Sequence, residues 1–124
     1  MLATGVDLLH ISRVRTALAR HGDRFLARVY TPGEIAYCCG RLPELAARFA
    51  AKEAASKALG VGMKVLNPSG IGWHEAEVLS GERGKPHLLL HGRAAALALE
   101  LGWREWSLSI AHERDTAIAF VVAL

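Results

Sequence analysis

Apolar residues follow two different periods along this chain of 124 residues. A mostly apolar segment over residues 2–9 and alternating stretches at 71–79, 87–91, 106–111 and 116–122 are typical of β-strands. Stretches rich in Ala, Leu, Arg and Glu at 13–20, 23–29, 32–39, 43–59 and 92–101 favour helices. The order of these elements predicts an α+β fold in which an antiparallel sheet packs on the long helix at 43–59.

Capping and turn residues mark the boundaries of these elements. Ser12 is the expected N-cap of the first helix, and Gly22 is expected to end it. The run Thr31–Glu34 combines a cap residue, a proline at the first helical position and an acid in the first turn. Residues 112–115 are expected to form the turn between the last two strands.

Length and composition restrict the class of protein. A chain of 124 residues, 52% of them hydrophobic, is expected to fold as a single domain over residues 1–124 and not to be disordered. Its longest apolar runs are too short to cross a bilayer, and no signal-peptide pattern follows Met1, so the cytoplasm is the expected compartment. Cys38 and Cys39 are adjacent, which predicts reduced thiols. The net charge of +3 suggests an anionic partner.

The long predicted helix carries a carboxylate and an ammonium side by side. Glu53, Ser56 and Lys57 are spaced i, i+3 and i+4, and Gly60 follows one turn later, so the four share one helix face. On a face of otherwise small residues, such a pair can hold a metal ion and a phosphate. Taken alone, a solvated Glu53–Lys57 ion pair is the commoner outcome of this spacing.

Asp7 is a second candidate, because it directly follows an apolar run and is expected near the end of the first strand. A lone Asp there is more often a turn or cap residue. Together with Glu53 it would supply two hard oxygen ligands, and Mg²⁺ is commonly held by one or two carboxylates with water and phosphate oxygens. Two carboxylates without a His or Cys cluster favour Mg²⁺ over zinc.

Two further segments could contact an anion. His112 follows a predicted strand and could donate to a phosphate, although a turn histidine bonded to backbone explains it as well. The loop Gly84–Pro86 can place a backbone N–H and the Lys85 ammonium near an anion, and an ordinary β-turn is the alternative.

Arginines dominate residues 10–30, which contain a single acid, Asp23. Arg13, Arg20 and Arg24 would lie near one face if the helical turn continued across Gly22. Such a face suits an acidic protein helix. Nucleic acid is disfavoured because no aromatic residue lies between Arg13 and Arg24 to stack on bases, and a merely solvated face remains an alternative.

These residues resemble the bacterial holo-[acyl-carrier-protein] synthases, the small group of 4′-phosphopantetheinyl transferases. Two blocks carry the resemblance: Gly5–Asp7, and Arg48–Ala58, which matches the family's Phe-Ala-x-Lys-Glu-Ala-x-x-Lys-Ala signature without a mismatch. Smaller matches in the family's order are Thr31–Glu34, Gly60–Gly62, Gly84–Pro86 and the late Ser-Ile-x-His motif at 109–112. Ala111 and Glu113 depart from the family, which commonly has Ser before this histidine and Thr, Ser or Asp after it.

The resemblance implies a 4′-phosphopantetheinyl transferase fold and a reaction. Coenzyme A would donate its 4′-phosphopantetheine group to a serine of an apo acyl carrier protein, leaving adenosine 3′,5′-bisphosphate. Asp7 and Glu53 would hold Mg²⁺, Glu53 would deprotonate the serine, and Lys57 would stabilise charge on the phosphate.

The same resemblance implies roles for the remaining candidates and an assembly. Lys85, Pro86 and His112 would contact coenzyme A, and the arginines at 13, 20 and 24 would dock the acidic carrier protein. A homotrimer with active sites between subunits is expected, with no membrane or nucleic-acid partner. One rival interpretation is a small basic module that only binds an acidic protein or nucleotide. In a second rival interpretation the protein is the same kind of transferase, but its acceptor is a carrier domain of a polyketide or lipid synthase.

Overall fold

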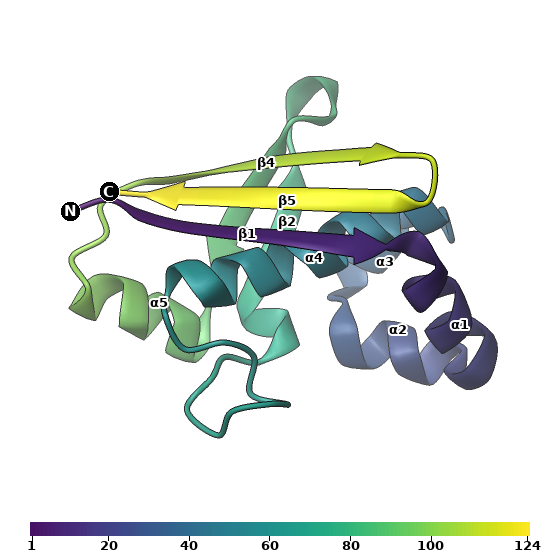
Figure 1. Ribbon diagram of the computed structural model, residues 1–124, viewed down its shortest axis with the longest axis horizontal. Coiled ribbons are helices and arrows are strands. Elements are labelled where there is room, and N and C mark those ends of the chain that lie inside the picture. Colours follow the sequence, from purple (N-terminus) through teal and green to yellow (C-terminus); the bar gives the residue numbers. More distant parts are fainter.

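The computed structural model describes residues 1–124, with helices and strands interleaved along the chain (Figure 1). The five helices are α1 Ile11–His21, α2 Asp23–Val29, α3 Pro32–Cys38, α4 Leu42–Ala58 and α5 Gly92–Glu100. The five strands are β1 Ala3–His10, β2 Ala76–Ser80, β3 Pro86–Leu90, β4 Trp106–Glu113 and β5 Thr116–Ala123. Two short 3₁₀ helices precede and follow β2, η1 Trp73–Glu75 and η2 Glu82–Gly84. The predicted α+β class is confirmed.

The strands form two antiparallel sheets, where the sequence pattern suggested one. β1, β5 and β4 lie side by side in that order, and β2 pairs only with β3. In Figure 1 the three-stranded sheet lies in front of α4, and the β2–β3 hairpin projects from its upper edge. Both chain termini lie at the same end of the sheet, because Ala3 of β1 pairs with Ala123 of β5.

Helix α4 occupies the centre of the fold and packs against the three-stranded sheet, β2 and α1. Eleven of its seventeen residues are buried, most of them alanines that let neighbouring elements approach closely. A helix buried on most of its circumference is not the solvated helix of the alternative interpretation. Its side chains are therefore positioned by tertiary packing.

Two capping predictions had opposite outcomes. The Thr31 cap is confirmed: the Glu34 amide donates to Thr31 Oγ1 at 3.2 Å, and the Thr31 amide donates to Glu34 Oε1 at 2.9 Å. The Ser12 cap is wrong, because α1 begins directly after β1 with His10 at the N-cap and no side-chain cap bond. The Ile11 amide is satisfied instead by the Asp115 carbonyl, at 2.8 Å, from the loop after β4.

Three predicted boundaries also differ. The turn expected at 112–115 is present but shorter: β4 continues to Glu113, with His112 paired to Ala117 of β5, so only Arg114 and Asp115 form the turn. The expected strand at 71–79 begins only at Ala76, because η1 precedes it. The long helix ends at Ala58, so Gly60 lies outside it at φ 80°. Pairing with β5 extends β4, whereas the end of α4 is local: the Val61 amide donates to the Ser56 carbonyl across Gly60, which takes the left-handed conformation.

Two simpler expectations concern the thiols and the bilayer. Cys38 and Cys39 are both free, Cys38 buried and Cys39 exposed. None of the helices combines the length and the apolar character needed to span a membrane.

Candidate functional site

Gly5 brings β1 into close contact with α4. A Cβ atom at this position would collide with the Ala54 carbonyl oxygen and would lie 2.7 Å from the Ala58 amide nitrogen. Only glycine permits this approach. Because side chains two residues apart on a strand point to the same face, Asp7 also faces α4. The Gly-Val-Asp step therefore places a carboxylate against the last turns of the helix.

Lys57 reaches Asp7 across this contact. Its Nζ donates to Asp7 Oδ1 at 2.9 Å and to the Val6 carbonyl at 3.0 Å. The Asp7 side chain is only 12% exposed, whereas that of Lys57 is 51% exposed. An ammonium group has three donors, so one N–H of Lys57 stays available to an anion from solvent.

Glu53 lies on the same face of α4 and forms no salt bridge. Burial raises the pKa of its carboxyl group, and the nearby Asp7 charge raises it further. Arg13 and Lys57 oppose this shift. The expected Glu53–Lys57 pair is thus replaced by Asp7–Lys57, and Glu53 is left as a carboxylate with increased affinity for a proton or a cation.

The two carboxylates can be tested as ligands for a cation. No group of three or more His, Cys, Asp or Glu side chains comes together as a metal site. The protein therefore offers only Asp7 and Glu53 here, both oxygen donors. A pair of carboxylates fits Mg²⁺, which is usually completed by water and substrate phosphates. It does not fit a structural zinc site, which needs four protein ligands.

The predicted contacts for coenzyme A lie elsewhere. His112 Nε2 is 3.9 Å from Glu44 Oε1, in the first turn of α4. Glu44 precedes Glu53 by nine residues, a separation of about 14 Å along a helix axis. Lys85 and Pro86 lie on the β2–β3 hairpin, whose Ser80 accepts from Arg48. The candidates thus form two groups, one towards each end of α4. The first group is Asp7, Glu53 and Lys57. The second group is Lys85, Pro86 and His112.

The arginines flank a break in the helix. Gly22, at φ 55° and ψ −130°, separates α1 from α2, so the helical turn does not continue across it. Arg13 and Arg20 line one surface hollow and Arg24 lines the next, with His21 shared between the two. The basic surface is present, but its residues come from two short helices. Arg13 also extends it towards Glu53.

Two buried cationic side chains on α4 were not predicted from the sequence. Lys52 is fully buried, and its Nζ donates to Glu34 Oε1 at 2.8 Å and to the Trp73 and Ala76 carbonyls at 2.9 Å. Burial lowers the pKa of Lys52, which the Glu34 carboxylate opposes. The only signal in the sequence is that Lys52 is surrounded by alanines on the apolar side of the helix.

Arg48 is the second buried cation. It is 1% exposed, pairs with Glu44 Oε2 at 2.9 Å and lies over the Tyr37 ring with its guanidinium carbon 4.4 Å from the ring centroid. Its NH2 group donates to Ser80 Oγ at 2.7 Å. Through this bond Arg48 holds the β2–β3 hairpin against the first half of α4. Lys85 lies on the same hairpin.

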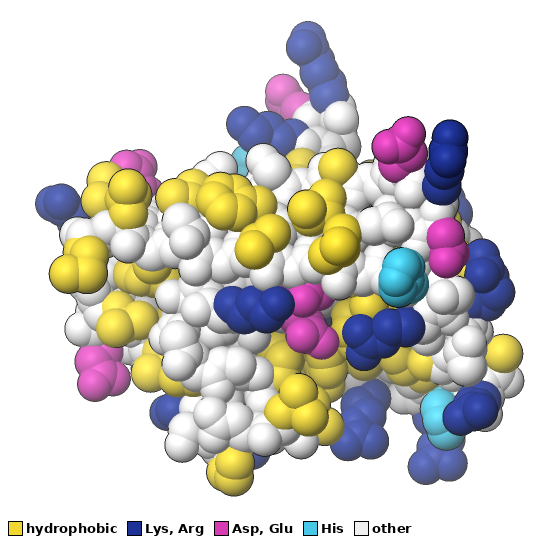
Figure 2. Space-filling view, in the orientation of Figure 1, with side chains coloured by type: hydrophobic (Ala, Val, Ile, Leu, Met, Phe, Trp, Pro, Cys, Tyr) yellow, Lys and Arg dark blue, Asp and Glu magenta, His cyan; other side chains and the backbone are white.

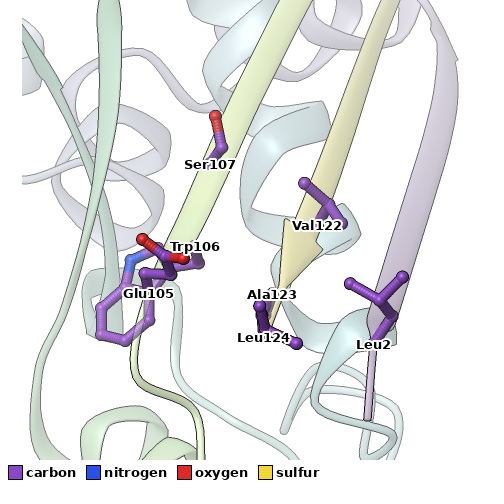
Figure 3. Close-up of a pocket in the computed structure, with 7 residues that line it drawn as sticks. All are labelled: Leu2, Glu105, Trp106, Ser107, Val122, Ala123 and Leu124. Carbon is purple, nitrogen blue, oxygen red and sulfur yellow. The ribbon is translucent and has the colours of Figure 1, made fainter.

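Another hollow, of about 210 Å³, lies at the end of the sheet where the two termini meet (Figure 3). Most of its lining is apolar, and Glu105 is its only charged residue. The full lining is Leu2, Glu105, Trp106, Ser107, Val122, Ala123 and Leu124. This hollow contains none of the candidate residues, so it is separate from both groups on α4.

Known proteins resemble this chain along its whole length. Residues 3–121 match the model of the 4′-phosphopantetheinyl transferase superfamily. The holo-[acyl-carrier-protein] synthase of Herpetosiphon aurantiacus is 52% identical, over 100% of this chain and 99% of that protein. The crystal structure of the Helicobacter pylori synthase in complex with coenzyme A has a TM-score of 0.85 at 29% identity, covering 98% of this chain and 99% of that one. The Neisseria meningitidis synthase has a TM-score of 0.84 at 32% identity, covering 98% and 97%. The chain therefore belongs to the 4′-phosphopantetheinyl transferase superfamily, as a member of its holo-[acyl-carrier-protein] synthase group.

Proposed function

We propose that residues 1–124 form one transferase domain that moves the 4′-phosphopantetheine group of coenzyme A to a serine of an apo acyl carrier protein, releasing adenosine 3′,5′-bisphosphate. The observation that carries the proposal is the cluster of Asp7, Glu53 and Lys57, in which two carboxylates and an exposed ammonium meet. The names of the relatives and the bound coenzyme A of the Helicobacter pylori protein support the substrate. The cytoplasm is the proposed location.

Within this cluster each side chain has a separate proposed task. Asp7 and Glu53 would hold Mg²⁺, which when bound supplies charge neutralisation at the diphosphate. The free N–H of Lys57 would donate to the phosphate oxygens, where charge builds up during transfer. The raised pKa of Glu53 suits it to accept the proton of the serine hydroxyl.

The acceptor would dock on the basic surface of α1 and α2. Arg13, Arg20 and Arg24 line adjoining hollows, and an acidic helix of the carrier would complement them. Because Arg13 belongs to this surface and is also near enough to Glu53 to lower the pKa of that carboxyl group, a carrier bound here would bring its serine towards the carboxylates.

A homotrimer with active sites between subunits belongs to the same proposal. The outer face of the three-stranded sheet, opposite α4, exposes a band of large apolar side chains, as the yellow patches of Figure 2 show. Its members are Val6, Leu8, Ile118 and Phe120. Exposed apolar patches of this kind mark association surfaces. Association would also explain the two groups of candidates at opposite ends of α4, if neighbouring subunits each contribute one group.

One incubation tests the transferase. Purified protein, coenzyme A, Mg²⁺ and an apo carrier protein of the fatty-acid type are combined, and the carrier is measured by intact mass. The expected product is a carrier with one phosphopantetheine adduct, formed only when Mg²⁺ is present. A polyketide-type carrier in a parallel reaction tests the acceptor. No adduct on either carrier would favour the binding-module interpretation.

Subunit complementation tests the shared site. D7A and H112A variants are each purified, mixed, dissociated and reassembled. Over all cyclic trimers reassembled at random from an equimolar mixture, about a quarter of the interfaces would combine an intact Asp7 group with an intact His112 group, and activity should recover to about that fraction. If both groups act within one subunit, the mixture gains nothing over its components.

A further inference from the structure

The Lys57–Asp7 ion pair has a consequence for how this site takes up its ligands, provided the proposed metal site is correct. The Lys57 ammonium already occupies one oxygen of Asp7, at 2.9 Å. A divalent cation bound by the same carboxylate would therefore lie within a few ångströms of a positive charge. Like charges at such a distance repel strongly outside bulk water.

The carboxylates of the cluster already have two cationic neighbours. Asp7 and Glu53 contribute two negative charges, and the pKa of Glu53 responds to two positive neighbours, Arg13 and Lys57. A metal ion entering by itself thus gains little net attraction. An anionic ligand that draws Lys57 or Arg13 away from the carboxylates would restore their attraction for the metal ion.

Lys57 is the more mobile partner of the ion pair. Asp7 is held on a strand with a side chain only 12% exposed, whereas Lys57 is 51% exposed on a flexible stem of four carbons. Its bond to the Val6 carbonyl keeps the ammonium near the site while the bond to Asp7 breaks. A diphosphate in front of the cluster offers it a new partner.

We propose that Lys57 is an internal counter-ion of Asp7 that is handed over to the diphosphate when the metal binds. Metal and diphosphate then bind cooperatively: the diphosphate draws the ammonium away from Asp7, where it opposes the metal, and the metal displaces the ammonium from Asp7, which frees it to bond to the diphosphate. The cooperativity is reciprocal: the diphosphate raises the metal affinity by the same factor as the metal raises the diphosphate affinity. The site therefore binds a free divalent cation weakly and binds it more tightly when the diphosphate is present.

Mn²⁺ binding tests the proposal without turnover. Free Mn²⁺ is measured by electron paramagnetic resonance, with and without inorganic pyrophosphate, and is corrected for the complex formed in buffer. The wild-type protein should bind Mn²⁺ weakly alone and at least about fivefold more tightly with pyrophosphate. K57M should bind Mn²⁺ alone about two- to fivefold more tightly than the wild type and should lose most of the pyrophosphate effect. K64M removes the same charge from an exposed loop residue and should behave like the wild type.

The outcomes separate this inference from the proposed function. Unchanged or weaker Mn²⁺ binding by K57M would overturn the counter-ion role and leave the metal site standing. No Mn²⁺ binding by the wild-type protein under either condition would overturn the metal site itself.

A side-chain NMR titration distinguishes hand-over from simple charge removal. With Mg²⁺ and pyrophosphate added, the Lys57 Nζ resonance, identified by its absence in K57M, should shift with the same midpoint as the Asp7 carboxyl carbon. A Lys57 signal that stays fixed while Asp7 shifts would overturn the hand-over.

Discussion

Lys57 bonds to Asp7, fifty residues away in sequence, and forms no salt bridge with Glu53, one helical turn before it. The spacing along α4 alone favours the local pair. The close contact of β1 with α4 at Gly5 brings a second carboxylate within reach, and the ammonium takes that one. Glu53 is left with a raised pKa and no salt bridge.

Isosteric removal of either carboxylate should abolish most transfer. We expect D7N and E53Q each to lower kcat/KM by about 10² to 10⁴ and to weaken the Mg²⁺ dependence, because metal charge neutralisation and proton transfer are lost. The measurement is the rate of carrier modification by intact mass across a Mg²⁺ series. E100Q, at the end of α5, is the matched control and should retain normal rates. Near-normal activity in D7N or E53Q would remove that residue from the site.

Gly5 should tolerate no side chain. A Cβ would collide with the backbone of Ala54 and Ala58, so we expect G5A to lower the free energy of unfolding by about 1–3 kcal/mol or more. It should also lower activity, because Asp7 moves with β1. Urea denaturation and the transfer assay measure the two effects. G33A is the control, since a Cβ there meets nothing closer than 3.6 Å. Wild-type stability in G5A would contradict the close contact.

Stability should depend on pH through Glu53. Below about pH 4.3 the carboxyl group is protonated in both folded and unfolded chains. As pH rises, the unfolded chain ionises first, because the folded pKa is raised, so ionisation favours unfolding. With a chelator present, E53Q should therefore be more stable than the wild type at pH 7.5, and the difference should vanish at about pH 3, well below the unfolded pKa. Urea denaturation at both values measures it, and a less stable E53Q at pH 7.5 would refute the shift.

Removing one partner of the buried Lys52–Glu34 ion pair should lower the free energy of unfolding strongly. K52M leaves the Glu34 carboxylate without its cation, and we expect a loss of about 3–5 kcal/mol in the free energy of unfolding. The double variant K52M/E34L removes both charges and should recover part of that loss. Thermal and urea denaturation provide the comparison. A double variant less stable than K52M would show that Glu34 stabilises mainly through the Thr31 and Val78 amides it accepts from.

Reversing charge on the basic surface should affect the carrier and not coenzyme A. R20E and R24E should each raise the KM for the carrier about three- to tenfold at low salt and flatten its salt dependence, because steered association is lost. The KM for coenzyme A should stay unchanged, which a titration at saturating carrier measures. R104E, in the loop before β4, serves as the charge-reversal control. An unchanged carrier KM in R20E and R24E would place the docking surface elsewhere.

The sequence by itself predicted the local structure and the family. The α+β class, the Thr31 cap and the long helix follow from periodicity and turn residues, which act over a few neighbouring positions. The Gly5–Asp7 and Arg48–Ala58 motifs likewise identified the family that the comparisons show. These properties depend on short-range geometry, which residue types specify directly.

Only the tertiary structure decided which charges meet. Apart from the alanines around Lys52, the local pattern does not separate Lys52, buried against Glu34, from Lys57, exposed beside Asp7, although both lie on one helix. The partners come from α3 and β1, far along the chain, and their positions depend on how those elements pack on α4. The same packing extended β4 through His112 and placed that residue beside Glu44, far from Glu53. Spacing in sequence determines which side chains share a face, and long-range packing determines what that face contacts.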